Sequence, residues 1–166
     1  MRSSPDIFQL IMMKSDRRPL FAQWFARLAV GLVFAVNVEC ALVFLFNPGG
    51  YVAGFELAGI PGEAAVQGFG LLFLMWNATY PLVLLRPVAQ RNLFAVLLVQ
   101  QAIGVAGETW LWMKLPAGHA ALYETVLRFI VFDGFGLVLM GSAFALLLAW
   151  GVPRPVAQET GNRAKD

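Results

Sequence analysis

Four long apolar runs constrain this chain more than any other feature of its sequence. They cover roughly residues 25–46, 66–85, 92–114 and 119–150. About 20 helical residues cross the ~30 Å hydrocarbon layer of a bilayer, so each run is long enough to span it. A membrane β-barrel would need alternating segments of about 10 residues instead. The sequence therefore predicts an all-α fold, an integral membrane four-helix bundle.

Proline follows the end of every run, and glycine accompanies it in three of the four. A helix rarely continues through them, because proline lacks the backbone N–H and glycine weakens the helix. We expect a cytoplasmic or interfacial tail over 1–24, the bundle over 25–150 and a cytoplasmic tail over 151–166. Residues 6–18 are predicted to form either a short interfacial helix or a loose tail. The four stops are Asn47-Pro48-Gly49-Gly50, Arg86-Pro87, Leu115-Pro116-Ala117-Gly118 and Gly151-Val152-Pro153.

Composition agrees with lipid as the solvent of this chain. Hydrophobic residues make up 59% of it and charged residues 13%, whereas a water-soluble domain has about a quarter of its residues charged. The pI of about 9.0 would suit nucleic acid as a partner. The basic residues, however, gather at the ends of the apolar runs, which is a membrane-topology pattern. We therefore exclude nucleic acid and expect the lipid bilayer as the partner.

The positions of Lys and Arg predict an orientation. Five of the twelve lie in residues 1–27, two in the link that contains Arg86 and Arg91, and three after residue 153. Lys114 is the single basic residue at the opposite face, and Arg128 lies inside a run. Under the positive-inside rule both termini are cytoplasmic. We expect a multi-pass protein of the cell (inner) membrane.

The runs contain polar residues that lipid disfavours. An ionised side chain at the centre of a membrane helix costs about 2.5–3.5 kcal/mol on insertion scales, so each such group needs a partner or a function. All of them are expected to face the interior of the bundle. The candidate polar cluster consists of Glu39, Asn77, Tyr80, Gln101, Glu108, Glu124, Arg128 and Asp133.

Helical geometry predicts partners within this cluster. Glu39, Glu108 and Arg128 lie at similar depths, about 9–14 Å from the outer ends of their spans, so Arg128 is expected to pair with Glu39, Glu108 or both. Glu124 lies four residues before Arg128 and can pair with it along one helix. Asp133 points about 140° away from Arg128 and needs another partner, for which Asn77 and Tyr80 are the candidates.

Two interpretations of the cluster remain open. In the first, its members hold the helices together and set their register, as polar side chains do in membrane bundles. In the second, they line a pocket that binds a polar head group, such as a quinone ring, or passes a proton. The outer loop over residues 47–65 is predicted to be either a plain interfacial loop or a lid over that pocket.

The sequence lacks the residues that several kinds of metal and catalytic site require. His119 is the single histidine and lies beside an outer loop, so neither a haem nor a di-iron site is expected. Cys40 is the single cysteine, which rules out a thiolate cluster, and no metal is expected. The chain contains none of the common catalytic motifs. Catalytic residues stay unassigned, and we expect binding rather than catalysis.

The segment Arg27-Leu28-Ala29-Val30-Gly31-Leu32-Val33-Phe34, the loop with Gly59-Ile60-Pro61-Gly62 and the compact four-span layout resemble the DoxX-like bacterial membrane proteins. The resemblance implies a quinone-linked or redox role. The first hypothesis is an accessory or binding subunit of such a membrane complex, together with other membrane subunits or as a homo-oligomer. The alternative is a stand-alone membrane enzyme or transporter for an amphipathic small molecule. No cofactor is identified, and quinone or lipid are the candidate ligands.

Overall fold

The computed structural model describes residues 17–150, and all regular secondary structure in this range is helical. This confirms the prediction of an all-α fold for these residues. Four segments are long and apolar enough to cross a membrane, with α3 and α4 together forming one of them. The tail predicted over 151–166 and residues 1–16 of the tail predicted over 1–24 lie outside the described residues, whereas residues 17–24 of that tail are helical. The elements are α2 (Arg17–Phe46), the 3₁₀ helices η1 (Pro48–Gly50) and η2 (Val52–Phe55), α3 (Gly59–Asn77), α4 (Tyr80–Leu85), α5 (Arg91–Lys114) and α6 (Ala120–Trp150).

Helices α2, α5 and α6 correspond to three of the four spans predicted from the sequence, and their bounds can be compared directly. Helices α5 and α6 begin within one residue of the predicted 92–114 and 119–150 and end at the same residues. Helix α2 is already helical at Arg17, well before the predicted start at residue 25. At ~1.5 Å per residue, α2 and α6 are each about 45 Å long, which exceeds the hydrocarbon thickness of a bilayer.

The second segment differs most from its prediction over 66–85. Its helix begins earlier, at Gly59, so the predicted loop over 47–65 is shorter than expected and contains η1 and η2. The chain then leaves the helix at Ala78 and Thr79 before α4 begins. Pro81 explains this break, because it has no N–H to donate to the carbonyl of Asn77 four residues earlier. The prediction of one continuous helix was wrong here.

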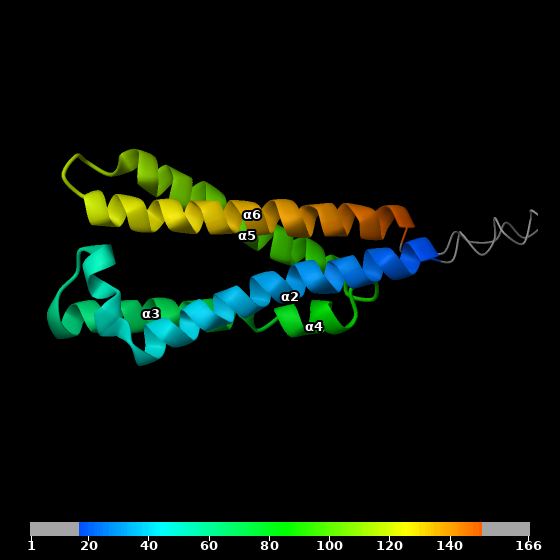
Figure 1. Cartoon of the computed structure of the whole chain (residues 1–166), viewed down its shortest axis with the longest axis horizontal. Coiled ribbons are helices and arrows are strands. Elements are labelled where there is room, and N and C mark those ends of the chain that lie inside the picture. Colours follow the sequence, from blue (N-terminus) through cyan, green and yellow to red (C-terminus); the bar gives the residue numbers. More distant parts are fainter. Residues whose placement is uncertain (1–16, 151–166) are drawn as a thin grey trace, which may run out of the picture.

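The helices form two pairs that lie close together at one end and separate toward the other (Figure 1). Helix α2 packs against α3 and α4, helix α5 packs against α6, and α2 also contacts α6. The described chain ends lie at the same end of the bundle, where the guanidinium of Arg18 stands 5.9 Å from the ring of Trp150. Arg27 donates a hydrogen bond of 3.2 Å to the carbonyl of Leu85 and so caps the end of α4.

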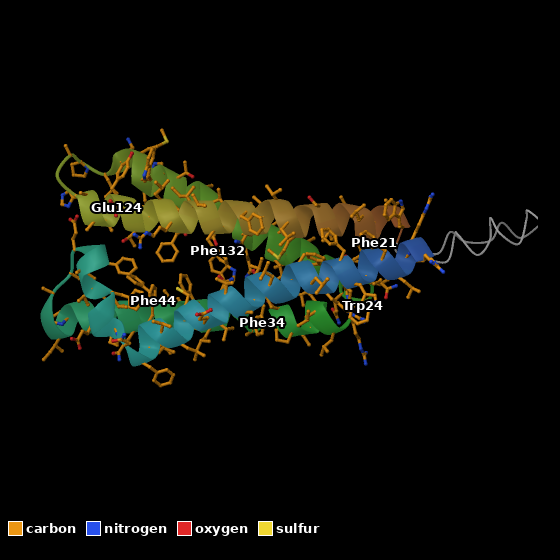
Figure 2. All side chains as sticks on the ribbon, viewed as in Figure 1. Phe21, Trp24, Phe34, Phe44, Glu124 and Phe132 are labelled. Atoms are coloured by element: carbon orange, nitrogen blue, oxygen red, sulfur yellow. The ribbon has the colours of Figure 1, made fainter. Side chains whose placement is uncertain are left out.

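We call the end with Arg17 and Trp150 the packed half. Between α2 and α6 it is filled mainly by small and aliphatic side chains, and most of them are fully buried. The opposite half carries larger side chains between the helix pairs, as Figure 2 shows around Phe44 and Phe132. The packed half includes Ala22, Ala26, Ala29, Val30, Met140, Ala143 and Leu147.

Candidate functional site

A cavity of about 260 Å³ lies between α2, α3, α5 and α6, beyond the packed half. Polar groups of four helices reach it, and aromatic rings form much of its wall. Five members of the predicted polar cluster are among its lining residues. The residues used below are the polar Asn37, Asn77, Gln101, Glu108, Arg128 and Asp133 and the aromatic Phe73, Trp76, Phe129 and Phe132.

Gln101 connects three helices through hydrogen bonds. The hydroxyl of Tyr80 donates to its Oε1 at 3.3 Å, and its Nε2 donates to Oδ1 of Asp133 at 2.8 Å and to the Asp133 carbonyl at 3.3 Å. Tyr80 is 0% exposed and Gln101 is 1% exposed, whereas Asp133 is half-buried, so the network is buried at Tyr80 and reaches the cavity at Asp133. Asp133 therefore pairs with Gln101 rather than with the predicted Asn77 or Tyr80, which corrects that expectation.

The break between α3 and α4 supplies a second set of polar contacts. Asn77, the last residue of α3, donates from Nδ2 to the carbonyl of Phe73 at 2.8 Å. Its Oδ1 accepts a hydrogen bond of 3.3 Å from Nδ2 of Asn37 on α2. Backbone that leaves the helix deep in a membrane segment is tolerated where protein covers it or where it lines a cavity. The break therefore positions both Asn77 and Tyr80 at the site.

Glu108 and Asp133 form a pair of neighbouring carboxyl groups. They lie within hydrogen-bonding reach of each other, Glu108 on α5 and Asp133 on α6. The Oε2 atom of Glu108 is buried and has no donor. Two ionised carboxylates only accept hydrogen bonds, so neither can satisfy the other. A shared proton, or a donor from a third group, would complete this pair.

Two glycines make room for these side chains. A Cβ on Gly104 would stand 2.8 Å from Oδ2 of Asp133, and one on Gly136 would stand 3.0 Å from Nε2 of Gln101. Gly70 likewise lies against α2, where an added Cβ would stand 2.8 Å from the carbonyl oxygen of Ala41. At Gly68, Gly107, Gly134 and Gly141, by contrast, an added Cβ would meet nothing within 4 Å.

The predicted ion pairs of Arg128 are wrong in part. Arg128 pairs with Glu124 at 3.8 Å, as the four-residue spacing predicted, and both side chains are largely exposed. It forms no salt bridge with Glu39 or Glu108 in the described chain. Glu39 is exposed on α2 and is not among the residues that line the cavity. Helical depth alone does not specify the rotation of each helix, so equal depth did not imply contact.

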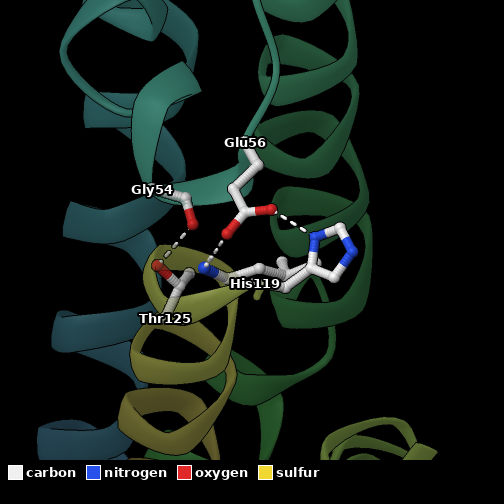
Figure 3. A network of polar contacts seen from close by, with 5 residues as sticks. Gly54, Glu56, His119 and Thr125 are labelled. Carbon is white, nitrogen blue, oxygen red and sulfur yellow. Dashed lines mark hydrogen bonds and ion pairs between the residues drawn. The ribbon is translucent and has the colours of Figure 1, made fainter. Parts of the chain in front are cut away.

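A cap formed by η2 and Glu56 covers the start of α6 (Figure 3). Glu56 Oε2 lies 2.5 Å from Nδ1 of His119, and Glu56 Oε1 accepts from the backbone N–H of Leu122 at 3.2 Å. Thr125 donates from Oγ1 to the carbonyl of Gly54 at 2.7 Å. The hydrogen bond from His119, reinforced by that from Leu122, lowers the pKa of Glu56 below its ordinary value. A carboxylate at the N-terminus of a helix is favoured by the exposed N–H groups there.

An aromatic cluster connects the cap to the cavity. Phe55 of η2 lies 5.7 Å from Phe44 and 6.2 Å from Phe129 between ring centroids. Phe129 in turn lies 6.0 Å from Phe73, and both rings line the cavity. The loop is therefore more than an interfacial connection, because one of its rings packs directly on the cavity wall.

Sequence reasoning missed several residues of this site. Neither Glu56 nor His119 was assigned to a site, although a carboxyl group and the single histidine in two loops at the same end of the bundle were the available signal. The aromatic wall was also missed, because phenylalanine is common in membrane helices. Pro81 was the signal for the helix break beside Asn77. Within residues 17–150, no group of three His, Cys, Asp or Glu side chains is placed to hold a metal ion.

Comparisons of the chain with protein-family models, with curated proteins and with solved structures find no match. The resemblance to the DoxX-like proteins therefore stays a prediction.

Proposed function

We propose that the protein is a multi-pass membrane protein whose ends are cytoplasmic and whose cavity binds the polar head of an amphipathic small molecule. The four apolar segments support the first part, and so does the charge pattern. Arg17, Arg18, Arg86 and Arg91 flank the packed half, whereas Lys114 ends α5 at the opposite end. The positive-inside rule then directs the packed half toward the cytoplasm and the cap outward.

The observation that carries the binding function is the position of the cavity. Asp133 lies about 20 Å along α6 from Ala120, close to the middle of a helix about 46 Å long. Polar groups at that depth are disfavoured unless they serve a site or hold helices together. The Gln101 network opens on a cavity, and Oε2 of Glu108, which also lines that cavity, is buried without a hydrogen-bond partner.

The size of the cavity favours a head group with an apolar remainder outside. Its volume of about 260 Å³ is at the lower limit of sites that enclose small molecules. A shallow apolar hollow on α6 shares Arg128 and Phe132 with it and continues over Leu127, Val131 and Phe135. An amphipathic ligand fits this arrangement with its head in the cavity and its chain along α6, in contact with lipid.

The sequence-based hypothesis of a redox-linked or quinone-linked complex is a narrower statement than this proposal. Its binding part agrees with the cavity. Its partner subunits, and the identity of a quinone as ligand, depend on the resemblance alone and stay predictions. The alternative of a stand-alone transporter or enzyme would use the same cavity, so binding is the step common to both hypotheses.

The test is to extract the ligand and to block its site. The full chain is purified in mild detergent, and bound small molecules are identified by mass spectrometry. Val36 lines the cavity, so Val36→Phe is expected to reduce the bound molecule severalfold by filling the space. Val99→Phe is the matched control, because Val99 is an exposed residue on α5. Equal amounts of the same molecules in both variants would contradict the proposal.

A further inference from the structure

The amide donors around the cavity are engaged, whereas carboxyl acceptors are free. Gln101 directs its amide nitrogen to Asp133, and the amide nitrogens of Asn37 and Asn77 bind Asn77 and Phe73. The carboxyl of Glu108 and Oδ2 of Asp133 receive no hydrogen bond from these amides. A ligand that complements this site must therefore supply hydrogen-bond donors.

Positive charge is missing beside the carboxyl pair. In the part of the chain from residue 17 to 150, no Lys, Arg or His nitrogen lies within 4.0 Å of Glu108 or Asp133. Arg128 is engaged with Glu124, and its side chain is 82% exposed. Unpaired carboxylates in apolar surroundings are costly, and a cation between them would remove that cost.

The wall of the cavity also favours a cation. Phe73, Trp76, Phe129 and Phe132 line it, and the faces of aromatic rings attract ammonium groups. Trp76 and Phe73 come from α3, whereas Phe129 and Phe132 come from α6, so rings contribute to the wall from both helix pairs. Aromatic rings around a carboxylate are the arrangement that recognises organic amines.

We infer that the cavity binds the protonated amine head of an amphipathic molecule, with the ammonium between Glu108 and Asp133; this rests on the proposed function. The ammonium donates to Glu108 Oε2 and to Asp133 Oδ2, the oxygens that the network leaves open. A quinone presents only carbonyl acceptors and would need a carboxyl proton to bind. A proton shared by the two carboxyls competes with the amine for the same place.

The experiment compares matched probes on the full chain in nanodiscs of phosphatidylcholine. The probes are phenylbutylamine, phenylbutanol and a short-chain benzoquinone, and binding is followed by tryptophan fluorescence and isothermal titration calorimetry. We expect the amine to bind about 10- to 100-fold more tightly than the alcohol, as for a hydrogen bond to a charged group. Glu108→Gln combined with Asp133→Asn should abolish this preference. Glu39→Gln, an exposed carboxyl on α2, should preserve it.

The outcomes separate this inference from the proposed function. If the alcohol or the quinone binds as tightly as the amine, and Val36→Phe prevents that binding, the cavity is a site but the amine assignment is wrong. If no probe binds the wild-type chain and no small molecule co-purifies with it, the proposed function fails as well. If the double variant is not recovered as monodisperse protein, the single variants are measured, and unchanged amine preference in both overturns the inference.

Discussion

The packed half of the bundle and the opposite half, which contains the cavity and is called the cavity half below, join the same helices by different means. In the packed half, Ala22, Ala26 and Ala29 form a stripe of small residues on α2 that lets α6 approach closely around Ala143. In the cavity half, Phe44 of α2 lies 6.4 Å from Phe129 of α6, centroid to centroid, and large rings replace the small side chains. Small residues allow close helix packing in membranes. The comparison shows that residue size, read along one helix pair, decides where the bundle closes and where it leaves a cavity.

The largest expected effect comes from a large side chain in the packed half. Ala26 is 0% exposed, so Ala26→Phe has no space and should lower stability by about 1–3 kcal/mol or more. Thermal unfolding in detergent measures the change. Leu28→Phe is the control, since Leu28 is 68% exposed on the same helix. Equal melting temperatures for the two variants would show that the packed half is not closely packed.

A smaller effect is expected from the network that separates the two halves. Gln101→Leu removes the partner of Tyr80 and of Asp133 while keeping a similar volume, and should lower stability by about 1–2 kcal/mol. A double-mutant cycle with Tyr80→Phe measures the part that depends on their hydrogen bond. If the effects of the two changes are simply additive, the Tyr80–Gln101 contact does not contribute to stability.

Sequence patterns predicted the apolar segments of this molecule better than the contacts between them. The four spans follow from hydropathy and from the Pro and Gly residues that stop them, because lipid forces backbone polar groups into helices. Residue type also identified the buried Asn77, Tyr80 and Gln101 and the half-buried Glu108 and Asp133 as polar groups of the bundle interior. To predict the pairings within the site, the rotation of each helix about its own axis would have to be known. Several contacts also join segments far apart in sequence, such as Glu56 with His119. Those distances could not be derived from spacing along one helix.

The cap should respond to acid with a modest effect. The pKa of Glu56 is lowered from its ordinary value of 4.5 mainly by the hydrogen bond to His119, so its stabilising contribution is present above that value. It is lost as the pH falls through the lowered pKa in the folded protein. Melting temperatures of wild type and Glu56→Gln should therefore differ at neutral pH and converge on acidification below about pH 4.5.

The matched control for the cap is Glu63→Gln. Glu63 is an exposed carboxyl on α3, close to the same end of the bundle. Its replacement should leave the melting temperature close to that of wild type at neutral pH. If Glu56→Gln keeps a constant difference at every pH, the interaction of Glu56 with His119 and with the start of α6 does not stabilise the folded protein.

The smallest effect is expected at Arg128, although its position inside an apolar run suggested the opposite. A buried ion pair with Glu39 or Glu108 would make Arg128→Leu cost about 3–5 kcal/mol, because a carboxylate would be left without its partner. The exposed pair with Glu124 contributes at most about 1 kcal/mol, so the melting temperature of Arg128→Leu should match that of Glu124→Gln closely. A large loss of stability in Arg128→Leu alone would indicate that Arg128 pairs with a carboxyl group of the cavity after all. The carboxyl pair would then have a cation of the protein itself beside it, so a ligand would not need to supply one. The cavity half would in that case be complete without a ligand, as the packed half is.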